Sequence, residues 1–208
     1  STLSIRKKDY AVVVEGYFDV MALHDSGITN VVASLGTALS RNQITLLSRA
    51  TDSKKILLNF DSDNAGIRAA NRAISEVENL AIQGQLDLRI LQLPSGKDPD
   101  EFLSVNSPSE YEALAAKAPL WMDWQIDQSL KDLDLNQSDQ FQEAVSALVS
   151  LLGKLPQTAI RTHYLQKVAQ RLSGGQGRFA LQLEEDLRNQ ISGQRWHGRS
   201  KKYDKPQE

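Results

Sequence analysis

Acidic residues recur in this chain just after runs of apolar and β-branched residues, where strands would end. Carboxylates that converge repel one another strongly unless a counter-charge is present. Hard divalent cations relieve that repulsion, and ligation by oxygen alone suits Mg²⁺ or Mn²⁺. The sequence therefore predicts a divalent metal site whose ligands come from Glu15, Asp19, Asp61, Asp63, Asp98 and Asp100.

Each of these motifs also has a plainer interpretation. The Asp61-Ser-Asp63 segment stands before a helix-like stretch, so Asp63 could simply cap a helix. Asp98-Pro-Asp100 has the composition of a turn. Glu15 is harder to dismiss, because a charge that ends an apolar strand needs a partner. The three motifs together favour a metal site over three unrelated structural features.

The first hundred residues alternate between short apolar runs and helix-like stretches. This alternation predicts an α/β fold with a mainly parallel sheet, flanking helices and right-handed crossovers. The carboxyl ends of parallel strands are where such sheets bind ligands. The expected strands are 11–15, 31–34, 55–60 and 87–93, and the expected helices between them are 17–26, 41–50 and 64–83.

From about residue 105 the pattern changes to successive helices, which predicts a small C-terminal helical bundle. The expected helices are 108–118, 119–134, 138–152, 157–172 and 178–191. The last residues carry more Lys and Arg than acids and few apolar side chains, which is typical of a disordered linker. The expected organisation is an α/β domain over 1–103, a helical subdomain over 104–192 and a flexible tail over 193–208.

Glycines and small residues near the acidic motifs suggest where a phosphate could approach. Gly16 and Gly66 would let the backbone come close to a phosphate. Gly36 and Thr37 could form a second phosphate-facing loop, although a tight strand-to-helix turn explains them equally well.

A cluster of large apolar residues follows Glu15. We expect it to pack the first helix of the α/β domain against the sheet; its members are Tyr17, Phe18 and Met21.

Composition excludes several classes of protein. The chain has 208 residues and no cysteine, so disulfides, zinc–thiolate sites and thiol catalysis are excluded, and three scattered histidines argue against any zinc site. No apolar run is long enough to span a membrane, so we expect no membrane contact and a cytoplasmic location. The net charge of −2 argues mildly against a self-sufficient DNA-binding domain.

Four of these segments resemble the toprim core of bacterial DnaG-type DNA primases. The resemblance covers about residues 8–103 closely, whereas the helical part agrees only in its placement. Toprim folds also occur in topoisomerases and some nucleases, but the Glu-Gly-Tyr-x-Asp-Val form with Ala-Ser-Leu-Gly-Thr resembles primases in particular. The segments are Val13–His24, Val32–Ala38, Phe60–Gly66 and Gly96–Asp100.

The resemblance implies template-directed synthesis of short RNA primers from ribonucleoside triphosphates. It implies that Glu15, Asp61 and Asp63 hold the catalytic ions, and that Asp19, Asp98 and Asp100 belong to the same cluster. Glu15 could instead assist proton transfer. The implied partners are a single-stranded DNA template, NTPs, an RNA–DNA hybrid and the replicative helicase.

The resemblance also implies that this chain is a monomeric piece of a longer enzyme. The family's zinc-binding module, basic subdomain and helicase-binding domain would then lie outside it, and the piece alone would be inactive. Two alternatives remain open: a fragment of a toprim nuclease or topoisomerase, or a metal-binding module without enzymatic activity.

Overall fold

The computed structural model describes residues 2–34, 39–94 and 97–203, with side chains described as far as residue 193. These residues form two compact units, Ser1–Trp124 and Gln125–Glu208. Each unit has its own core and is described by itself.

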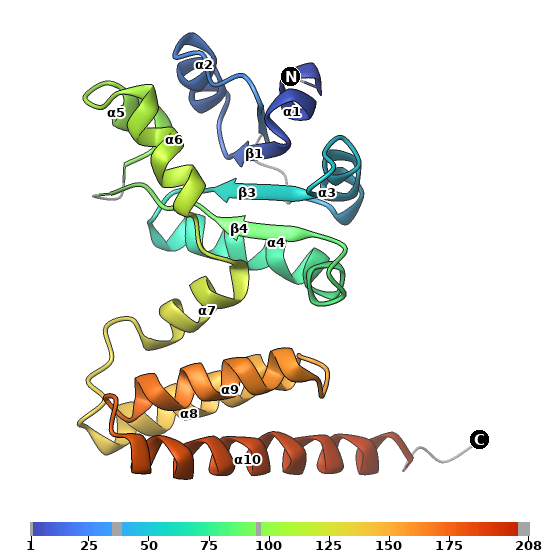
Figure 1. Ribbon diagram of the computed structural model, residues 1–208, viewed down its shortest axis with the longest axis vertical. Helices are drawn as coiled ribbons and strands as arrows, with labels where there is room; N and C mark the ends of the chain where they lie inside the picture. The colour runs from blue at the N-terminus through green and yellow to red at the C-terminus, as the bar shows by residue number, and fades with distance from the viewer. Residues whose placement is uncertain (1, 35–38, 95–96, 204–208) are drawn as a thin grey trace. The chain divides into compact units, whose positions relative to one another are not determined.

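The first unit is built on a four-stranded parallel sheet (Figure 1). Its order is β2-β1-β3-β4, so the chain builds first to one side of β1 and then to the other. The point where the direction reverses lies between β1 and β3, which is where open α/β sheets form a ligand crevice. The strands are β1 (Tyr10–Val14), β2 (Val31–Ala33), β3 (Lys55–Asn59) and β4 (Asp87–Ile90).

Helices connect and cover these strands, as the alternation in the sequence predicted. Two of these helices, α3 and α6, begin with a capping box. The boxes are formed by Ser40 with Gln43 and by Ser107 with Glu110. The short helices α1 and α5 were not predicted. The helices of this unit are α1 (Thr2–Lys8), α2 (Tyr17–Asp25), α3 (Arg41–Ser48), α4 (Asn64–Ile82), α5 (Pro99–Leu103) and α6 (Pro108–Lys117).

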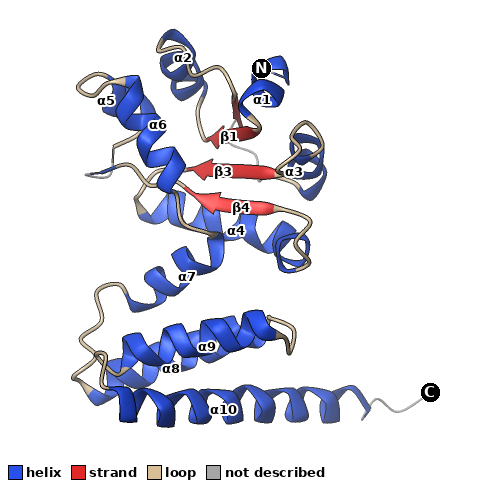
Figure 2. Cartoon of the chain, in the orientation of Figure 1, coloured by secondary structure: helices blue, strands red, loops and turns tan. Residues whose placement is uncertain are grey.

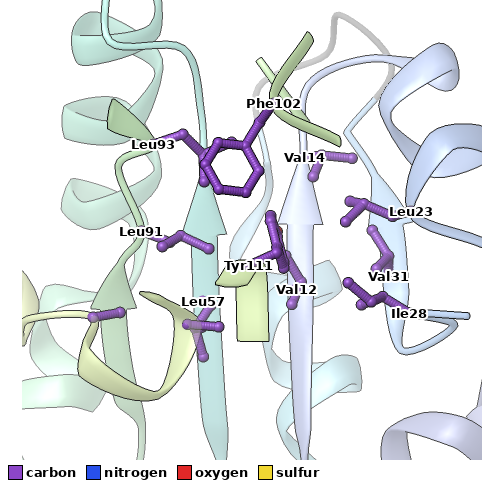
Figure 3. Close-up of a cluster of buried hydrophobic side chains, with 12 residues drawn as sticks. Val12, Val14, Leu23, Ile28, Val31, Leu57, Leu91, Leu93, Phe102 and Tyr111 are labelled. Carbon is purple, nitrogen blue, oxygen red and sulfur yellow. The ribbon is translucent and has the colours of Figure 1, made fainter. Parts of the chain in front are cut away.

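One hydrophobic cluster joins the sheet to the helices that follow it (Figure 3). Val12 and Leu57 contribute from the two central strands, and Phe102 and Tyr111 contribute from α5 and α6. The Tyr111 hydroxyl donates to Asn59 Oδ1 at 2.8 Å in the interior, which satisfies both polar groups. This contact fixes α6 over the carboxyl end of β3.

The first unit extends further along the chain than the predicted boundary after residue 103. The reason is that α6 buries Tyr111 and Ala115 in the core of the α/β domain. Beyond it, Leu120 forms an antiparallel bridge with Arg89 of β4, and Arg89 also donates to the Ala118 carbonyl. These contacts place 104–124 with the sheet rather than with the helical subdomain.

The second unit contains helices and, in its described residues, no strand (Figure 2). The division between the units falls inside α7 (Trp121–Leu130), and α10 (Gly177–Tyr203) packs against both α8 (Ser138–Gly153) and α9 (Ala159–Leu172). Helix α10 continues to Tyr203, into the segment that the sequence predicted to be a flexible tail. Among the described residues, no helix has the length and apolar character that would let it cross a membrane.

Candidate active site

The register of β1 and β3 brings the first two acidic motifs together. Val14 pairs with Asn59, so the residues that follow them leave the sheet side by side. The Asp61 backbone N–H donates to Glu15 Oε1 at 3.3 Å. Glu15 is therefore held against the loop that carries Asp61, across the point where the chain direction reverses.

Asp19 faces the same edge from the first turn of α2. Its side chain is 8% exposed, and its Oδ2 accepts from the Gly16 backbone N–H at 2.9 Å. This hydrogen bond closes the start of α2 and turns the carboxylate inward. Because α2 packs against α5, Asp19 also comes near Asp98.

Asp63 and Asp98 are helix caps, as the plainer interpretation allowed for Asp63. Asp63 Oδ1 accepts from Gly66 N at 2.7 Å at the start of α4. Asp98 Oδ1 accepts from Glu101 N at 2.7 Å at the start of α5. Capping does not remove these residues from the acidic edge, because each cap engages one carboxylate oxygen and leaves the second available for a ligand.

The pKa values show that the carboxylates interact across this edge. Burial is the main cause in each case and raises the pKa of Asp19 from 3.8 to about 6. Burial, followed by the negative charge of Asp61, raises the pKa of Glu15, although Arg72 opposes the shift. Burial and then the charge of Asp98 raise the pKa of Asp61. The edge therefore concentrates negative charge that a cation would neutralise.

Two residues near this cluster were missed in the sequence. Glu101 adds its negative charge to the field on Asp61, and Arg72 of α4 contributes the positive charge near Glu15. Glu101 directly follows Asp98-Pro-Asp100, and that adjacency was a signal available in the sequence. Asp100 is exposed in the first turn of α5. Within the segment 98–101, the negative charges that raise the pKa of Asp61 are those of Asp98 and Glu101.

The described carboxylates do not yet form a metal site as they stand. Within residues 2–34, 39–94 and 97–203, no three His, Cys, Asp or Glu side chains are close enough to hold an ion. The donor set nevertheless fits a hard cation, because it offers carboxylate oxygens, which suit Mg²⁺ and Mn²⁺ and not zinc–thiolate chemistry. Four of these carboxylates are oriented by a backbone N–H group that donates to one of their two oxygens. They are Glu15, Asp19, Asp63 and Asp98.

Gly66 has a structural role that the sequence did not reveal. A β-carbon at this position would lie 2.1 Å from the Asp61 carbonyl oxygen and 2.8 Å from the Asp61 nitrogen. Only glycine lets the Asp61–Asp63 loop fold back over the first turn of α4. Gly16 is less crowded, since a β-carbon at this position would have the Asp19 carboxylate as its nearest neighbour, at 3.0 Å. The predicted loop residues Gly36 and Thr37 lie outside the described residues.

The prediction that the aromatic residues after Gly16 pack α2 against the sheet is wrong. Tyr17 is 63% exposed, Phe18 is 75% exposed and Met21 is 44% exposed. The inward face of α2 is formed instead by Asp19 and Leu23, which are buried.

We expect Asp19 to make the metal-free protein less stable as pH rises. Its pKa is higher in the folded chain than in the unfolded one, so folding favours the protonated form. The loss of folding stability that ionised Asp19 causes is absent below about pH 4, grows up to about pH 6 and is complete above that. Asp19→Asn keeps the acceptor for Gly16 N and removes the charge. In EDTA, urea unfolding should show wild type losing stability relative to Asp19→Asn between about pH 4 and pH 7. Parallel pH profiles would contradict this.

Comparison with known proteins shows the family. Residues 12–103 match the family described as Toprim-like, and residues 122–177 match the family described as the DnaB-helicase binding domain of primase. The DNA primase of Synechococcus elongatus is 61% identical over 203 residues, which is 98% of this chain and 29% of that protein. The chain thus spans less than a third of that relative's length.

Solved structures agree with this likeness. The RNA polymerase domain of Mycobacterium tuberculosis primase DnaG, in complex with double-stranded DNA, is 28% identical with a TM-score of 0.69. That match covers 83% of this chain and 54% of the other. A DnaG primase catalytic domain bound to single-stranded DNA is 30% identical with a TM-score of 0.62, covering 80% of this chain and 51% of the other. These likenesses do not favour the nuclease or topoisomerase alternative. The chain belongs to the DnaG-type DNA primase family, and its first unit carries the toprim fold of that family.

Proposed function

We propose that this chain is part of the catalytic core of a bacterial DNA primase, which synthesises short RNA primers on a DNA template. The observation that carries the proposal is the acidic edge between β1 and β3, where Glu15 and Asp61 are joined by a hydrogen bond. This chain, which carries that edge, is 61% identical to a DNA primase over 98% of its own residues. A metal-binding module without activity would not account for that identity.

We propose that the catalytic ions are bound by Glu15, Asp61 and Asp63. Further acidic members of the site are Asp19, Asp98 and Asp100. Bound Mg²⁺ or Mn²⁺ would neutralise charge on the attacking and leaving oxygens of the phosphoryl transfer. The chain's own contribution is to orient the carboxylates through backbone hydrogen bonds. Glu15 has a raised pKa, which suits either a metal ligand or a group that accepts a proton.

The implied partners are a single-stranded DNA template, ribonucleoside triphosphates and the RNA–DNA hybrid that they form. The relatives solved with single-stranded and double-stranded DNA support a nucleic-acid substrate. The match of residues 122–177 to a helicase-binding family supports a replicative helicase as a further partner. The match also supports a helicase contact inside this chain, whereas the sequence predicted that contact only outside it. The replication machinery of bacteria is cytoplasmic, and we assign the chain to it.

Incorporation of labelled ribonucleotides on single-stranded DNA tests the function. The full-length primase that contains this chain should make primers, and the 208-residue chain alone should make none. The physical reason is that phosphoryl transfer depends on positioning, and a misplacement of about 1 Å can cost roughly 100-fold. An inactive full-length protein that remains folded and binds metal would refute the proposal. Activity of the chain alone would place the nucleotide contacts within it.

We expect divalent ions to stabilise the chain. An ion bound only by the folded state adds stability by mass action and relieves the repulsion among the carboxylates. Mg²⁺ or Mn²⁺ should raise the melting temperature, and Asp61→Asn combined with Asp63→Asn should remove most of that rise. Asparagine can still cap α4, so the double variant should fold. An equal rise in the double variant would place the ion elsewhere.

A further inference from the structure

A groove of about 660 Å³ lies within the helical second unit. Its walls are the connection between α7 and α8, the start of α8, the end of α9 and the start of α10, and these segments meet at one end of the bundle (Figure 1). The volume is in the range of sites that hold a ligand or a group of partner side chains. No residue of the acidic edge lines this groove, so it is a separate feature of the chain.

Apolar side chains line the groove and are left partly uncovered. Leu172 is buried at its base, Leu135 and Phe141 are half-buried, and Phe179 is 41% exposed. Phe179 stands next to Ala180, which is buried, so α10 directs one apolar residue into the bundle and its neighbour into the groove. Amide side chains contribute to the polar part of the lining; they are Asn136, Gln142 and Gln176.

Hydrogen bonds fix both walls of the groove. On one side, Gly175 N donates to the Gln170 carbonyl oxygen at 3.0 Å and Gly174 has a φ of 62°, which is a Schellman end to α9. On the other side, Asp134 N donates to Gln140 Oε1 at 2.7 Å and ties the α7–α8 connection to α8. A surface that is already ordered loses less conformational entropy on binding, so these walls favour a specific partner.

A fixed negative charge lies at the rim of the groove. Asp134 Oδ1 accepts from the backbone N–H and the side-chain amide of Asn136, a lining residue, at 3.0 Å and 2.9 Å. These hydrogen bonds, the backbone one above all, lower the pKa of Asp134 and keep it ionised. The lining residue Arg171 already pairs with Asp127. The charge that remains for a partner is therefore negative, and it favours a partner that brings a Lys or Arg.

The secondary structure of the second unit decides what kind of segment fits. Its described residues contain no strand, so they offer no sheet edge to which an extended peptide could add (Figure 2). A groove between helices takes the apolar face of another helix, with side chains spaced three and four residues apart. The match of residues 122–177 to a helicase-binding family contains every lining residue except Phe179. That overlap favours the helicase over other proteins as the source of the helix.

We infer that this groove holds an amphipathic helix of the replicative helicase. An apolar side chain of that helix packs against Phe179, and a Lys or Arg of the same helix pairs with Asp134. The inference rests on the proposed function, which includes the helicase as a partner, and adds the surface and the chemistry of the contact.

The experiment measures the Kd between the 208-residue chain and the purified replicative helicase of the same bacterium by fluorescence anisotropy. Because the chain has no cysteine, one introduced cysteine carries the fluorophore at a single known position. Asn79→Cys suits this purpose, since Asn79 is exposed on α4 in the first unit. Melting temperatures show that each variant is folded.

Phe179→Ala should weaken helicase binding at least about tenfold, which is the scale of losing an aromatic anchor at the centre of an interface. Phe179→Leu keeps an apolar side chain and should bind within a few-fold of wild type. Leu181→Ala is the matched control, because Leu181 is 71% exposed on the same helix but does not line the groove. It should leave the Kd unchanged.

Asp134→Asn should weaken binding several-fold and make the Kd less sensitive to salt, because it removes the charge that attracts the partner. Asparagine still offers an oxygen to Asn136 N, so the wall of the groove should persist. Asp25→Asn is the control for this change, since Asp25 is exposed at the end of α2 in the first unit. It should alter neither the Kd nor its salt dependence.

A bulky adduct tests the location without removing an apolar residue. In a chain whose only cysteine is Gln142→Cys, the adduct should block helicase binding, and the helicase carries the fluorophore instead. The same adduct on Ser150→Cys should not block binding, because Ser150 is exposed on α8 but does not line the groove. This pair decides the question even if Phe179→Ala fails to fold.

Three outcomes would overturn the inference. Unchanged affinity in Phe179→Ala and with the Gln142→Cys adduct would place the contact on another surface. A wild-type dimer that Phe179→Ala dissociates, seen by sedimentation without helicase, would assign the groove to a second copy of the chain. Absence of any binding by wild type would remove the helicase contact from this chain. Primer synthesis by the full-length primase without helicase tests the proposed catalytic function separately, so the two failures are distinguishable.

Discussion

Glu15→Gln in the full-length primase should lower primer synthesis at least about 100-fold while the protein stays folded. Changes to residues that merely orient a metal ligand already cost about 10- to 100-fold, and a ligand itself should cost no less. Glutamine has nearly the same shape and still offers an oxygen to the Asp61 N–H. What it removes is the negative charge, which both a metal ligand and a proton acceptor require.

The measurement is the rate of labelled ribonucleotide incorporation at saturating template and NTP. Glu76→Gln is the matched control, because it makes the same chemical change at an exposed position on α4. Template affinity and melting temperature in the absence of metal should be close to wild type for both variants. Synthesis by Glu15→Gln within a few-fold of wild type would remove Glu15 from the catalytic assignment.

Gly66→Ala should destabilise the first unit by about 3 kcal/mol or more and abolish primer synthesis. The added methyl group would lie 2.1 Å from the Asp61 carbonyl oxygen, and the backbone atoms that it meets cannot rotate away as a side chain can. Overpacking typically costs about 1–3 kcal/mol even where flexible side chains can adjust. The loop that carries Asp61 and Asp63 would have to move, so the damage should reach the acidic edge directly.

Thermal unfolding checks this, with an expected fall in melting temperature on the order of 10 °C. Gly177→Ala is the matched control: this glycine also lies in the first turn of a helix, but an added β-carbon meets nothing within 4 Å. It should be neutral or slightly stabilising. If Gly66→Ala has the melting temperature and activity of Gly177→Ala, the close approach of Asp61 to α4 does not exist in solution.

The loss of stability in Gly16→Ala should lie between those of Gly66→Ala and Gly177→Ala. Its added methyl group would meet the Asp19 carboxylate at 3.0 Å, and that carboxylate is the end of a side chain that can rotate. Stability should fall little, while the stabilisation by divalent ions should weaken because Asp19 is displaced. Melting curves with and without Mg²⁺ separate the two effects, and an unchanged metal response would remove Asp19 from the ligand set.

The sequence by itself determined the features that depend on neighbours along the chain. Apolar runs predicted all four strands, and the capping boxes at Ser40 and Ser107 predicted where two helices begin. The position of Glu15 and Asp61 just after two such runs predicted that they lie at the carboxyl edge of the sheet. These signals are local, because burial of a strand and capping of a helix are properties of a few consecutive residues.

Only the tertiary structure decided which of these residues lie together and which face outward. The order β2-β1-β3-β4 makes β1 and β3 neighbours, and that pairing of distant segments brings Asp61 to Glu15. The packing of α2 buries Asp19 and exposes Phe18, although the two are adjacent in the sequence. The close approach of Asp61 to Gly66 likewise depends on how a loop folds back in space. In each case the deciding free energy comes from packing between elements that are distant in the sequence. That packing cannot be predicted from the residues of either element alone.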